Sequence, residues 1–344
     1  MIRVLVAEDS AVTREYLAYL LGQDPMLRVV GLARDGQEAL EQAEQLKPDV
    51  ILMDVHMPRL DGYEATRRIM ERIPTPIVMV SASLDRDEVA ISFEALKAGA
   101  VTLVDKPRGP DHPAQAESAR RLVETVKLMA EVKVVRRFPR RERPVTPPSF
   151  PGPSDRTIRL VAIAASTGGP QVLAEILAGL QANFAPAILI VQHIAPGFTE
   201  GLAQWLGHAT PLEVKVSAPA EGVRPGVVYL APEGYQMGIT KDGRIRLTKD
   251  LFEDGFRPSA SYLFHSVAEA YGRSAVGVVL TGMGRDGASG LRQLREAGGV
   301  TIAQDETTSV VFGMPAEAIR LGAAEYILPR GQIAPAIRSL VTRG

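Results

Sequence analysis

Ser166 stands where two different roles are open to it. It follows the apolar run "VAIAA" and precedes Thr-Gly-Gly-Pro. Pro170 fits the first turn of a helix, where its missing N–H costs nothing, so Ser166 could be an ordinary helix N-cap. The Gly-Gly pair lets the backbone pass close to a ligand, and a helix N-terminus favours a developing negative charge. These features are compatible with a serine nucleophile beside an oxyanion site, and equally with plain anion binding.

Two distant residues could act together with Ser166. His193 directly follows the apolar run "AILIVQ", and Asp286 lies in the glycine-rich turn "GMGRDG". Taken singly, His193 could be a hydrogen-bonded core histidine and Asp286 a turn residue. All three positions nevertheless fall just beyond the carboxyl ends of expected strands, where residues far apart in sequence can meet. Together they are compatible with a catalytic triad, because such triads are recognised by roles rather than by order.

A second set of polar residues closes the apolar runs nearer the N-terminus. Its members are Glu8, Asp9, Asp54, Ser81 and Lys106. Three carboxylates at one sheet edge repel one another unless a cation lies among them, and oxygen ligands in an incomplete cage suit Mg²⁺. The lysine and the serine hydroxyl would suit a carboxylate that becomes an acyl phosphate, because phosphoryl transfer needs chiefly positioning and charge neutralisation. The set therefore predicts a phosphorylated aspartate.

Two α/β domains are expected to position these two sets. Val/Ile/Leu-rich runs without polar alternation are typical of parallel strands covered on both faces, and helical spacings separate them here. In the first domain the runs span residues 2–8, 28–33, 49–54, 76–81 and 101–106. From residue 157 the alternation repeats, with a hairpin signal in "YQMGITKDGRIRLTKD". We predict two doubly wound parallel-sheet α/β domains, the first flavodoxin-like and the second three-layered.

A stretch of different composition separates the two domains. Residues 136–156 combine arginines with prolines and have almost nothing apolar to bury. Because prolines favour extended polyproline geometry, we predict a semi-stiff tether, with a basic docking strip as the alternative. The expected organisation is a first domain over residues 1–130, a linker over 131–156 and a second domain over 157–344.

The overall composition narrows the class of protein. A formal net charge of −1 provides no basic field that would point to nucleic acid or to an anionic membrane. The absence of cysteine excludes disulfides, thiolate metal sites and a cysteine nucleophile. The sequence begins without a signal-peptide pattern and has no uncharged apolar stretch of about 18 residues. We therefore expect a cytoplasmic protein that does not insert into membranes.

Residues 1 to about 130 resemble a two-component receiver domain. The motifs "EDS", "LMDVHMPRLDGYE", "VSAS" and "DKP" occur in the order typical of receivers. The resemblance implies that a histidine kinase phosphorylates Asp54. It also implies Mg²⁺ ligands and phosphoryl contacts, namely Glu8, Asp9, Asp54 and the carbonyl of His56 for the metal, and Ser81 and Lys106 for the phosphoryl group. Leu103 occupies a position where many receivers carry an aromatic switch residue, so an aromatic rotamer switch is not expected.

Over nearly its full length the chain is similar to the chemotaxis protein-glutamate methylesterase family (CheB). The similarity rests on "ASTGGP", "VQHIAPGFT", "YLAPEGYQM", "RPSASYLFHSVAEAYG", "VVLTGMGRDGASGL" and "IAQDETTSVVFGMPAEAI", following the receiver. It implies hydrolysis of glutamate methyl esters on the cytoplasmic helices of chemoreceptors, with release of methanol and without a catalytic metal. Some members of the family also deamidate receptor glutamines. The family further implies that the unphosphorylated receiver covers the esterase cleft until phosphorylation releases it.

Carried over by position, the similarity assigns five roles. Ser166 is the nucleophile, His193 its general base and Asp286 the group that orients His193. The backbone N–H of Met283 would help to bind the oxyanion, and Thr167 would support the site.

Two positions depart from the family pattern. Ala164 replaces a common glycine and could crowd the strand end, while Ser261 stands where the family usually has an acid.

The alternative function is a response regulator whose second domain binds an anion or a protein without catalysis. A DNA-binding output is disfavoured, because no helix-turn-helix pattern competes with the α/β pattern.

Overall fold

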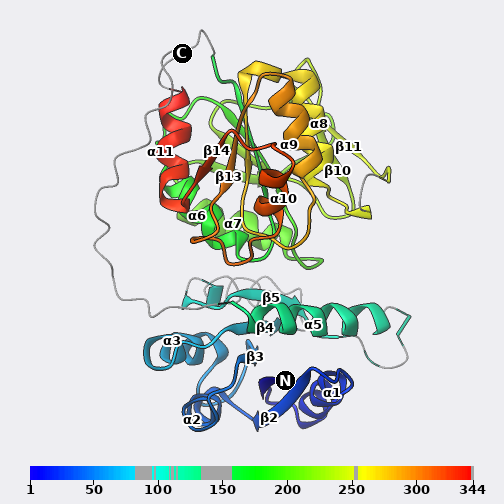
Figure 1. Ribbon diagram of the computed structural model, residues 1–344, viewed down its shortest axis with the longest axis vertical. Coiled ribbons are helices and arrows are strands. Elements are labelled where there is room, and N and C mark those ends of the chain that lie inside the picture. Colours follow the sequence, from blue (N-terminus) through cyan, green and yellow to red (C-terminus); the bar gives the residue numbers. More distant parts are fainter. Residues whose placement is uncertain are drawn as a thin grey trace. The chain divides into compact units, whose positions relative to one another are not determined.

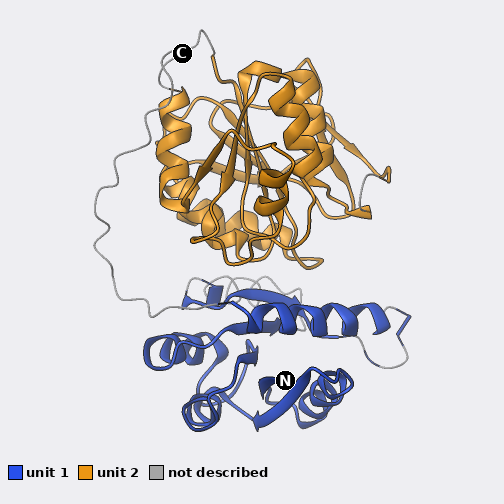
Figure 2. Ribbon diagram, viewed as in Figure 1, with its two compact units in different colours: residues 1–141 blue, residues 142–344 orange. Residues whose placement is uncertain are grey.

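The chain divides into two compact units, the N-terminal unit of residues 1–141 and the C-terminal unit of residues 142–344 (Figure 2). The computed structural model describes residues 1–81, 95–96, 98–107, 109, 112–113, 115–132, 157–251 and 255–341. Residues 133–156 of the expected linker lie outside the described residues. The same holds for most of residues 87–100, where helical spacing separates two of the expected strands. None of the described helices has the length and apolar composition that crossing a membrane requires.

The N-terminal unit is built on a parallel five-stranded sheet with the order β2-β1-β3-β4-β5 (Figure 1). Its strands are β1 (Ile2–Ala7), β2 (Leu27–Ala33), β3 (Val50–Asp54), β4 (Ile77–Ser81) and β5 (Thr102–Asp105). Its described helices are α1 (Ala11–Gly22), α2 (Gly36–Leu46), α3 (Gly62–Arg72) and α5 (Gln115–Ala130). This strand order is that of a flavodoxin-like fold, which confirms the predicted class.

Local sequence explains where these elements begin and why the sheet is covered. Every residue of β3 and β4 is buried, as the continuous apolar runs predict for strands with helices on both faces. Helices α1, α2 and α3 begin after Ser10, Asp35 and Asp61, whose side chains accept hydrogen bonds from backbone N–H groups of the first turn. Helices α1 and α5 pack together, and α2 and α3 pack together (Figure 1).

The C-terminal unit contains a parallel seven-stranded sheet with the order β14-β13-β12-β6-β7-β9-β8. Its strands are β6 (Leu160–Ala165), β7 (Ala187–Gln192), β8 (Glu213–Val216), β9 (Val227–Leu230), β12 (Ala275–Val279), β13 (Val300–Gln304) and β14 (Tyr326–Leu328). The antiparallel pair β10 (Gln236–Ile239) and β11 (Ile245–Thr248) forms the expected hairpin. The sheet is therefore the second parallel α/β sheet that the sequence predicted.

Helices cover both faces of this sheet and complete the three layers. They are α6 (Gly169–Ala178), α7 (Thr199–Ala209), α8 (Ala260–Ala270), α9 (Ala288–Glu296), α10 (Met314–Arg320) and α11 (Arg330–Val341), with a 3-10 turn at Gly272–Ser274. Helix α6 packs against α7 and α11, whereas α8 packs against α9 and the β10 strand on the other side (Figure 1).

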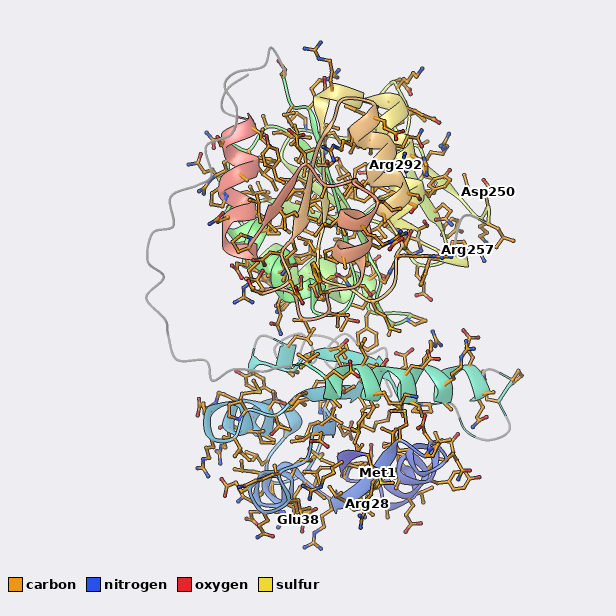
Figure 3. All side chains as sticks on the ribbon, viewed as in Figure 1. Met1, Arg28, Glu38, Asp250, Arg257 and Arg292 are labelled. Atoms are coloured by element: carbon orange, nitrogen blue, oxygen red, sulfur yellow. The ribbon has the colours of Figure 1, made fainter. Side chains whose placement is uncertain are left out.

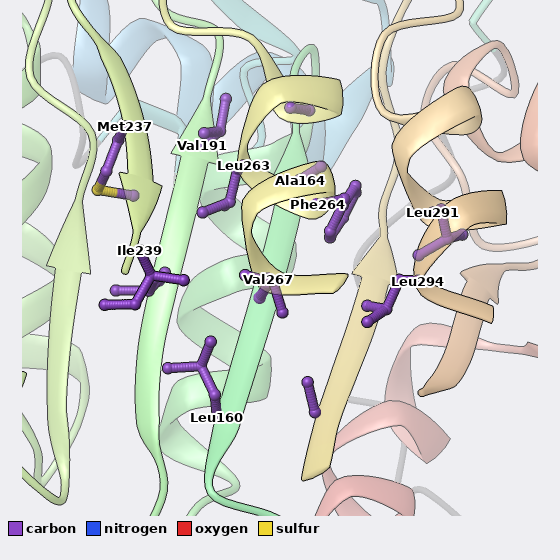
Figure 4. Packing of buried hydrophobic residues seen from close by; sticks show 14 of the residues in the cluster. Leu160, Ala164, Val191, Met237, Ile239, Leu263, Phe264, Val267, Leu291 and Leu294 are labelled. Atoms are coloured by element: carbon purple, nitrogen blue, oxygen red, sulfur yellow. The ribbon is translucent and has the colours of Figure 1, made fainter. Parts of the chain in front are cut away.

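The main hydrophobic cluster of the C-terminal unit lies between the sheet and the layer of α8 and α9. Leu160 and Val191 of the sheet, Phe264 of α8 and Leu291 of α9 all belong to this cluster (Figure 4). Ala164 belongs to it and is 0% exposed, so its methyl group is part of the core packing. This packing fixes β6, β7 and β12 as neighbours beneath α8, and the candidate site lies at their carboxyl ends.

Candidate active site

Ser166 directly follows β6 and is held by its backbone rather than used as a helix cap. Its N–H donates to the carbonyl of Thr281 at 3.0 Å, and its carbonyl accepts from the side-chain amide of Gln192 at 2.8 Å. Helix α6 begins after Gly168, whose φ of 77° provides the chain reversal, and no side chain caps this helix. The N-cap interpretation of Ser166 is therefore wrong. Ser166 is half-buried, and its hydroxyl does not cap α6.

The order of the strands brings the three residues of the expected triad to one edge. Strands β12, β6 and β7 are adjacent in the sheet, and Ser166, His193 and Asp286 follow their carboxyl ends. The backbone N–H of His193 donates to the carbonyl of Ala165, immediately before Ser166, at 2.9 Å. His193 Nε2 lies 2.9 Å from Asp286 Oδ2, within ion-pair distance, although the two atoms do not have the geometry of a hydrogen bond.

Asp286 is buried at the N-terminus of α8 and is surrounded by hydrogen-bond donors. Its carboxylate accepts from Ser259 Oγ at 2.9 Å and from the backbone N–H groups of Ala260 at 2.7 Å and Ser261 at 3.0 Å. Burial raises the pKa of Asp286, but the nearby His193 and the N–H groups that donate to the carboxylate outweigh burial and lower the pKa below its ordinary value. Asp286 is therefore ionised at neutral pH and can hold a proton on His193 Nε2.

Ser261 is buried and takes part in the hydrogen bonds around Asp286. It is 1% exposed, and its hydroxyl accepts from the N–H of Gly287 at 2.8 Å and from Ser289 Oγ at 3.1 Å. Gly287 is the N-cap residue of α9. Ser261 thus joins the start of α8 to the start of α9 beside Asp286, although it lacks the acid that the family pattern led us to expect.

The segment after β12 places Met283 beside Ser166. Gly282 precedes Met283, and a methyl group built on Gly282 would lie 2.7 Å from Ser166 Cβ, so the two backbones are in close contact. The carbonyl of Gly282 accepts from the N–H groups of Gly313 at 3.1 Å and Met314 at 2.9 Å, which fixes this loop. Within the described part of the chain, the N–H of Met283 has no protein acceptor. An unpaired donor beside a serine is what an oxyanion site requires.

Thr167 contributes its backbone to the same network. Its carbonyl accepts from the buried hydroxyl of Thr281 at 2.9 Å, and the N–H of Val311 donates to that hydroxyl at 2.9 Å. One threonine side chain therefore connects the loop after Ser166 with the segment before α10. The Thr167 side chain is half-buried at the site.

Sequence reasoning missed several residues that support this site. They are Gln192, Gln236, Phe256, Ser259 and Thr281. Ser259 could have been found, because a serine directly before a helical pattern is a typical N-cap, and the structure uses it as one. The two glutamines and Phe256 carry no local signal, because their contacts cross between segments distant in sequence.

The N-terminal unit brings the second polar set together at the carboxyl end of its sheet. Carboxylate oxygens of Glu8, Asp9 and Asp54 lie within 4.8 Å of one another. Lys106 Nζ lies 2.8 Å from Glu8 Oε2 and 3.0 Å from Asp54 Oδ1. The remaining expected members lie at the ends of two neighbouring strands, with Ser81 buried at the end of β4 and the exposed His56 just after β3.

Electrostatics in this cluster favour an additional cation. Burial raises the pKa of Glu8 and of Asp54, and Lys106 offsets this effect only in part. Burial lowers the pKa of Lys106, but its contacts with the two carboxylates outweigh burial and raise the pKa. One lysine thus forms ion pairs with two buried carboxylates, while the third carboxylate, that of Asp9, is exposed. Hard oxygen ligands with unbalanced negative charge fit Mg²⁺.

Comparisons with known proteins agree for both units. The family description "CheB methylesterase" matches residues 161–337, and "Response regulator receiver domain" matches residues 4–130. The chain is 51% identical over 343 residues to a protein-glutamate methylesterase/protein-glutamine glutaminase of Geobacter metallireducens, which covers 99% of both chains. A relative of the same name from Nitrosospira multiformis is 51% identical and covers 99% of this chain and 97% of its own length. The crystal structure of the Thermotoga maritima CheB methylesterase catalytic domain matches 54% of this chain and all of its own, with a TM-score of 0.52 and 39% identity.

Proposed function

Because the chain belongs to the CheB methylesterase family and carries a receiver domain, we propose that it hydrolyses glutamate methyl esters on chemoreceptors and is activated by phosphorylation of Asp54. The receptor helices that carry such esters lie in the cytoplasm, so the proposed activity is cytoplasmic. The observation that carries this proposal is the 2.9 Å contact between His193 and the buried, ionised Asp286, which follow the two strands that flank β6, the strand before Ser166.

The contact with Asp286 determines which nitrogen of His193 acts as the base. We assign the ring proton to Nε2, because this nitrogen lies 2.9 Å from the ionised Asp286, so that Nδ1 is left without a proton and is the base. Nδ1 takes the proton of Ser166 while Oγ attacks the ester carbonyl. The N–H of Met283 donates to the oxyanion, and such a donor contributes about 3 to 4 kcal/mol in comparable sites.

The same groups complete the reaction. The imidazolium of His193 returns its proton to the departing methoxide, which leaves as methanol. Water then attacks the acyl-enzyme with His193 again as the base, and free glutamate and Ser166 are regenerated. None of these steps needs a metal. A glutamine side chain at the same position would release ammonia instead, which is the proposed second activity and is consistent with the names of the relatives.

The N-terminal unit would regulate this activity. We assign phosphorylation of Asp54 to a chemotaxis-type histidine kinase, with Lys106 and Ser81 contacting the phosphoryl group. Mg²⁺ held by Glu8, Asp9, Asp54 and the carbonyl of His56 would neutralise the charge that builds up between the carboxylate and the phosphoryl group. Lys106 already faces Asp54 at 3.0 Å, so it can stabilise the same charge.

The decisive experiment measures methanol release from methylated receptor. Ser166→Ala should lower the rate by about 10⁴- to 10⁶-fold, because members of a triad act as a unit. Ser274→Ala is the matched control, since Ser274 precedes β12 at the opposite end of the strand, and it should retain the wild-type rate. Substantial methanol release by Ser166→Ala would overturn the assignment of the nucleophile. No release by the wild-type protein, combined with receptor binding, would favour a non-catalytic binding domain.

Regulation is tested on the full-length protein with acetyl phosphate and Mg²⁺. The wild type should incorporate label at Asp54 and release methanol faster, whereas Asp54→Ala should do neither. Label retained by Asp54→Ala would refute the phosphorylation site. Labelling of the wild type without acceleration would separate phosphorylation from activation.

A further inference from the structure

An aromatic ring lies against the imidazole of the expected general base. The rings of Phe256 and His193 are stacked, with centroids 4.7 Å apart and planes inclined by 9°. This separation lies in the range where aromatic rings attract one another. Phe256 is nevertheless 42% exposed, which is unusual for a large apolar side chain whose only purpose is core packing.

A buried amide holds Phe256 in this place. Gln236, at the start of β10, is 0% exposed, and its Nε2 donates to the carbonyl of Phe256 at 2.8 Å. Its Oε1 accepts from the N–H of Ser259 at 2.8 Å. One side chain thus fixes both ends of the segment from Phe256 to Ser259, between Asp250 and the start of α8; Asp250 and Arg257 are labelled in Figure 3.

The same segment supports His193 from a second direction. Ser259 and the N-terminus of α8 hold the carboxylate of Asp286, which contacts His193 Nε2. A single polar contact fixes the direction of one ring nitrogen but leaves the plane of the ring free to rotate, because the terminal torsion of histidine has broad minima. The stack with Phe256 fixes that plane. Two restraints from one anchored segment therefore determine where His193 Nδ1 points.

We propose that Phe256 is a positioning residue for the esterase reaction, which holds the His193 ring so that Nδ1 faces Ser166 and which shields one ring face from water. This inference rests on the proposed function, because it requires His193 to act as the base. It assigns Phe256 a role in the chemical step rather than in receptor binding.

The test replaces the ring while keeping an apolar side chain. Phe256→Leu should lower kcat about 3- to 10-fold with KM changed less than about twofold, because loss of a stack weakens positioning and not substrate contact. Phe256→Tyr keeps the ring and should restore kcat. Leu251→Ala is the matched control, since Leu251 is an apolar side chain that is 81% exposed just before the segment, and its kcat should equal that of the wild type.

A small serine-directed reagent separates positioning from receptor contact. A sulfonyl fluoride needs an activated Ser166 but no docked receptor helix. Phe256→Leu should therefore slow its reaction with the full-length protein by the same factor as kcat, and Phe256→Tyr should not. In the wild type, ring-current shifts of the His193 proton resonances should report the stack, and they should disappear in Phe256→Leu.

Each outcome has a defined meaning. A raised KM with an unchanged rate of labelling would make Phe256 a receptor contact and overturn the proposal. Unchanged kcat, KM and labelling in Phe256→Leu would overturn it as well. If the wild type neither releases methanol nor reacts at Ser166, the proposed esterase function fails, and that result is distinguishable from a failure of the inference about Phe256.

Discussion

Gly282 gives a direct test of how closely the oxyanion segment must pack on the nucleophile. In Gly282→Ala the new Cβ would lie 2.4 Å from Met314 Sδ and 2.7 Å from Ser166 Cβ. The Met314 thioether is the end of a flexible side chain and can move aside. Ser166 Cβ is attached directly to the backbone, so relief there requires the nucleophile or the Gly282 loop to move.

The size of the effect follows from these distances. Ordinary contact begins near 3.4 Å, so the separation at Ser166 must grow by about 0.7 Å. Overpacking of a filled site costs about 1 to 3 kcal/mol of unfolding free energy. A displacement approaching 1 Å at a reacting group can lower a rate by about 10²-fold. We therefore expect kcat for methanol release to fall about 10- to 100-fold. We also expect the free energy of unfolding of the C-terminal unit to fall by about 1 to 3 kcal/mol.

The assay combines methanol release with urea unfolding. Trp205, the single tryptophan of the chain, is 9% exposed and reports unfolding of the C-terminal unit alone. Gly222→Ala is the control, because a methyl group on Gly222 meets nothing within 4 Å and the backbone there does not need glycine. A Gly282→Ala protein with kcat within twofold of the wild type would show that the close packing of Gly282 on Ser166 is not needed for catalysis.

Two further predictions follow from the charged groups. Because the pKa of Asp286 is lowered from 3.8, its carboxylate stabilises the fold above that pH, and this contribution is lost as the pH falls through the lowered pKa. The difference in unfolding free energy between wild type and Asp286→Asn, followed by Trp205 fluorescence, should therefore be constant between about pH 5 and 7 and shrink below about pH 4; a difference independent of pH would contradict this. Mg²⁺ should raise the thermal unfolding temperature of the N-terminal unit in calorimetry and should lose this effect in Asp9→Asn and Asp54→Ala, because the ion relieves repulsion among the carboxylates. An equal shift in wild type and variants would place any Mg²⁺ site elsewhere.

The sequence by itself determined the two sheets and the positions of most polar residues along them. Continuous apolar runs indicate parallel strands because both faces of such strands are buried, and β3, β4, β6 and β7 are buried at every residue. Short strands were missed. β8 has four partly exposed or exposed residues and β14 has three residues, and both lie at the edges of the sheet, where burial leaves no continuous apolar signal.

Local patterns also left the role of Ser166 open between a helix cap and a nucleophile. A serine followed by Thr-Gly-Gly-Pro is compatible with either, since both need a residue just before a helix. The structure excludes the cap, because Gly168 with its positive φ starts α6 two residues later. That choice depends on the backbone path of the loop, which residue types restrict but do not fix.

Only the tertiary structure decided which residues meet. The sequence placed Ser166, His193 and Asp286 after strands, but the order β12-β6-β7 makes those strands neighbours. The folded structure also places the N-terminus of α8 against Asp286 and stacks the ring of Phe256 on the ring of His193. These contacts join segments separated by tens of residues, and their geometry depends on strand order and on helix packing over the whole core. No local pattern of hydrophobicity or turn residues carries that information.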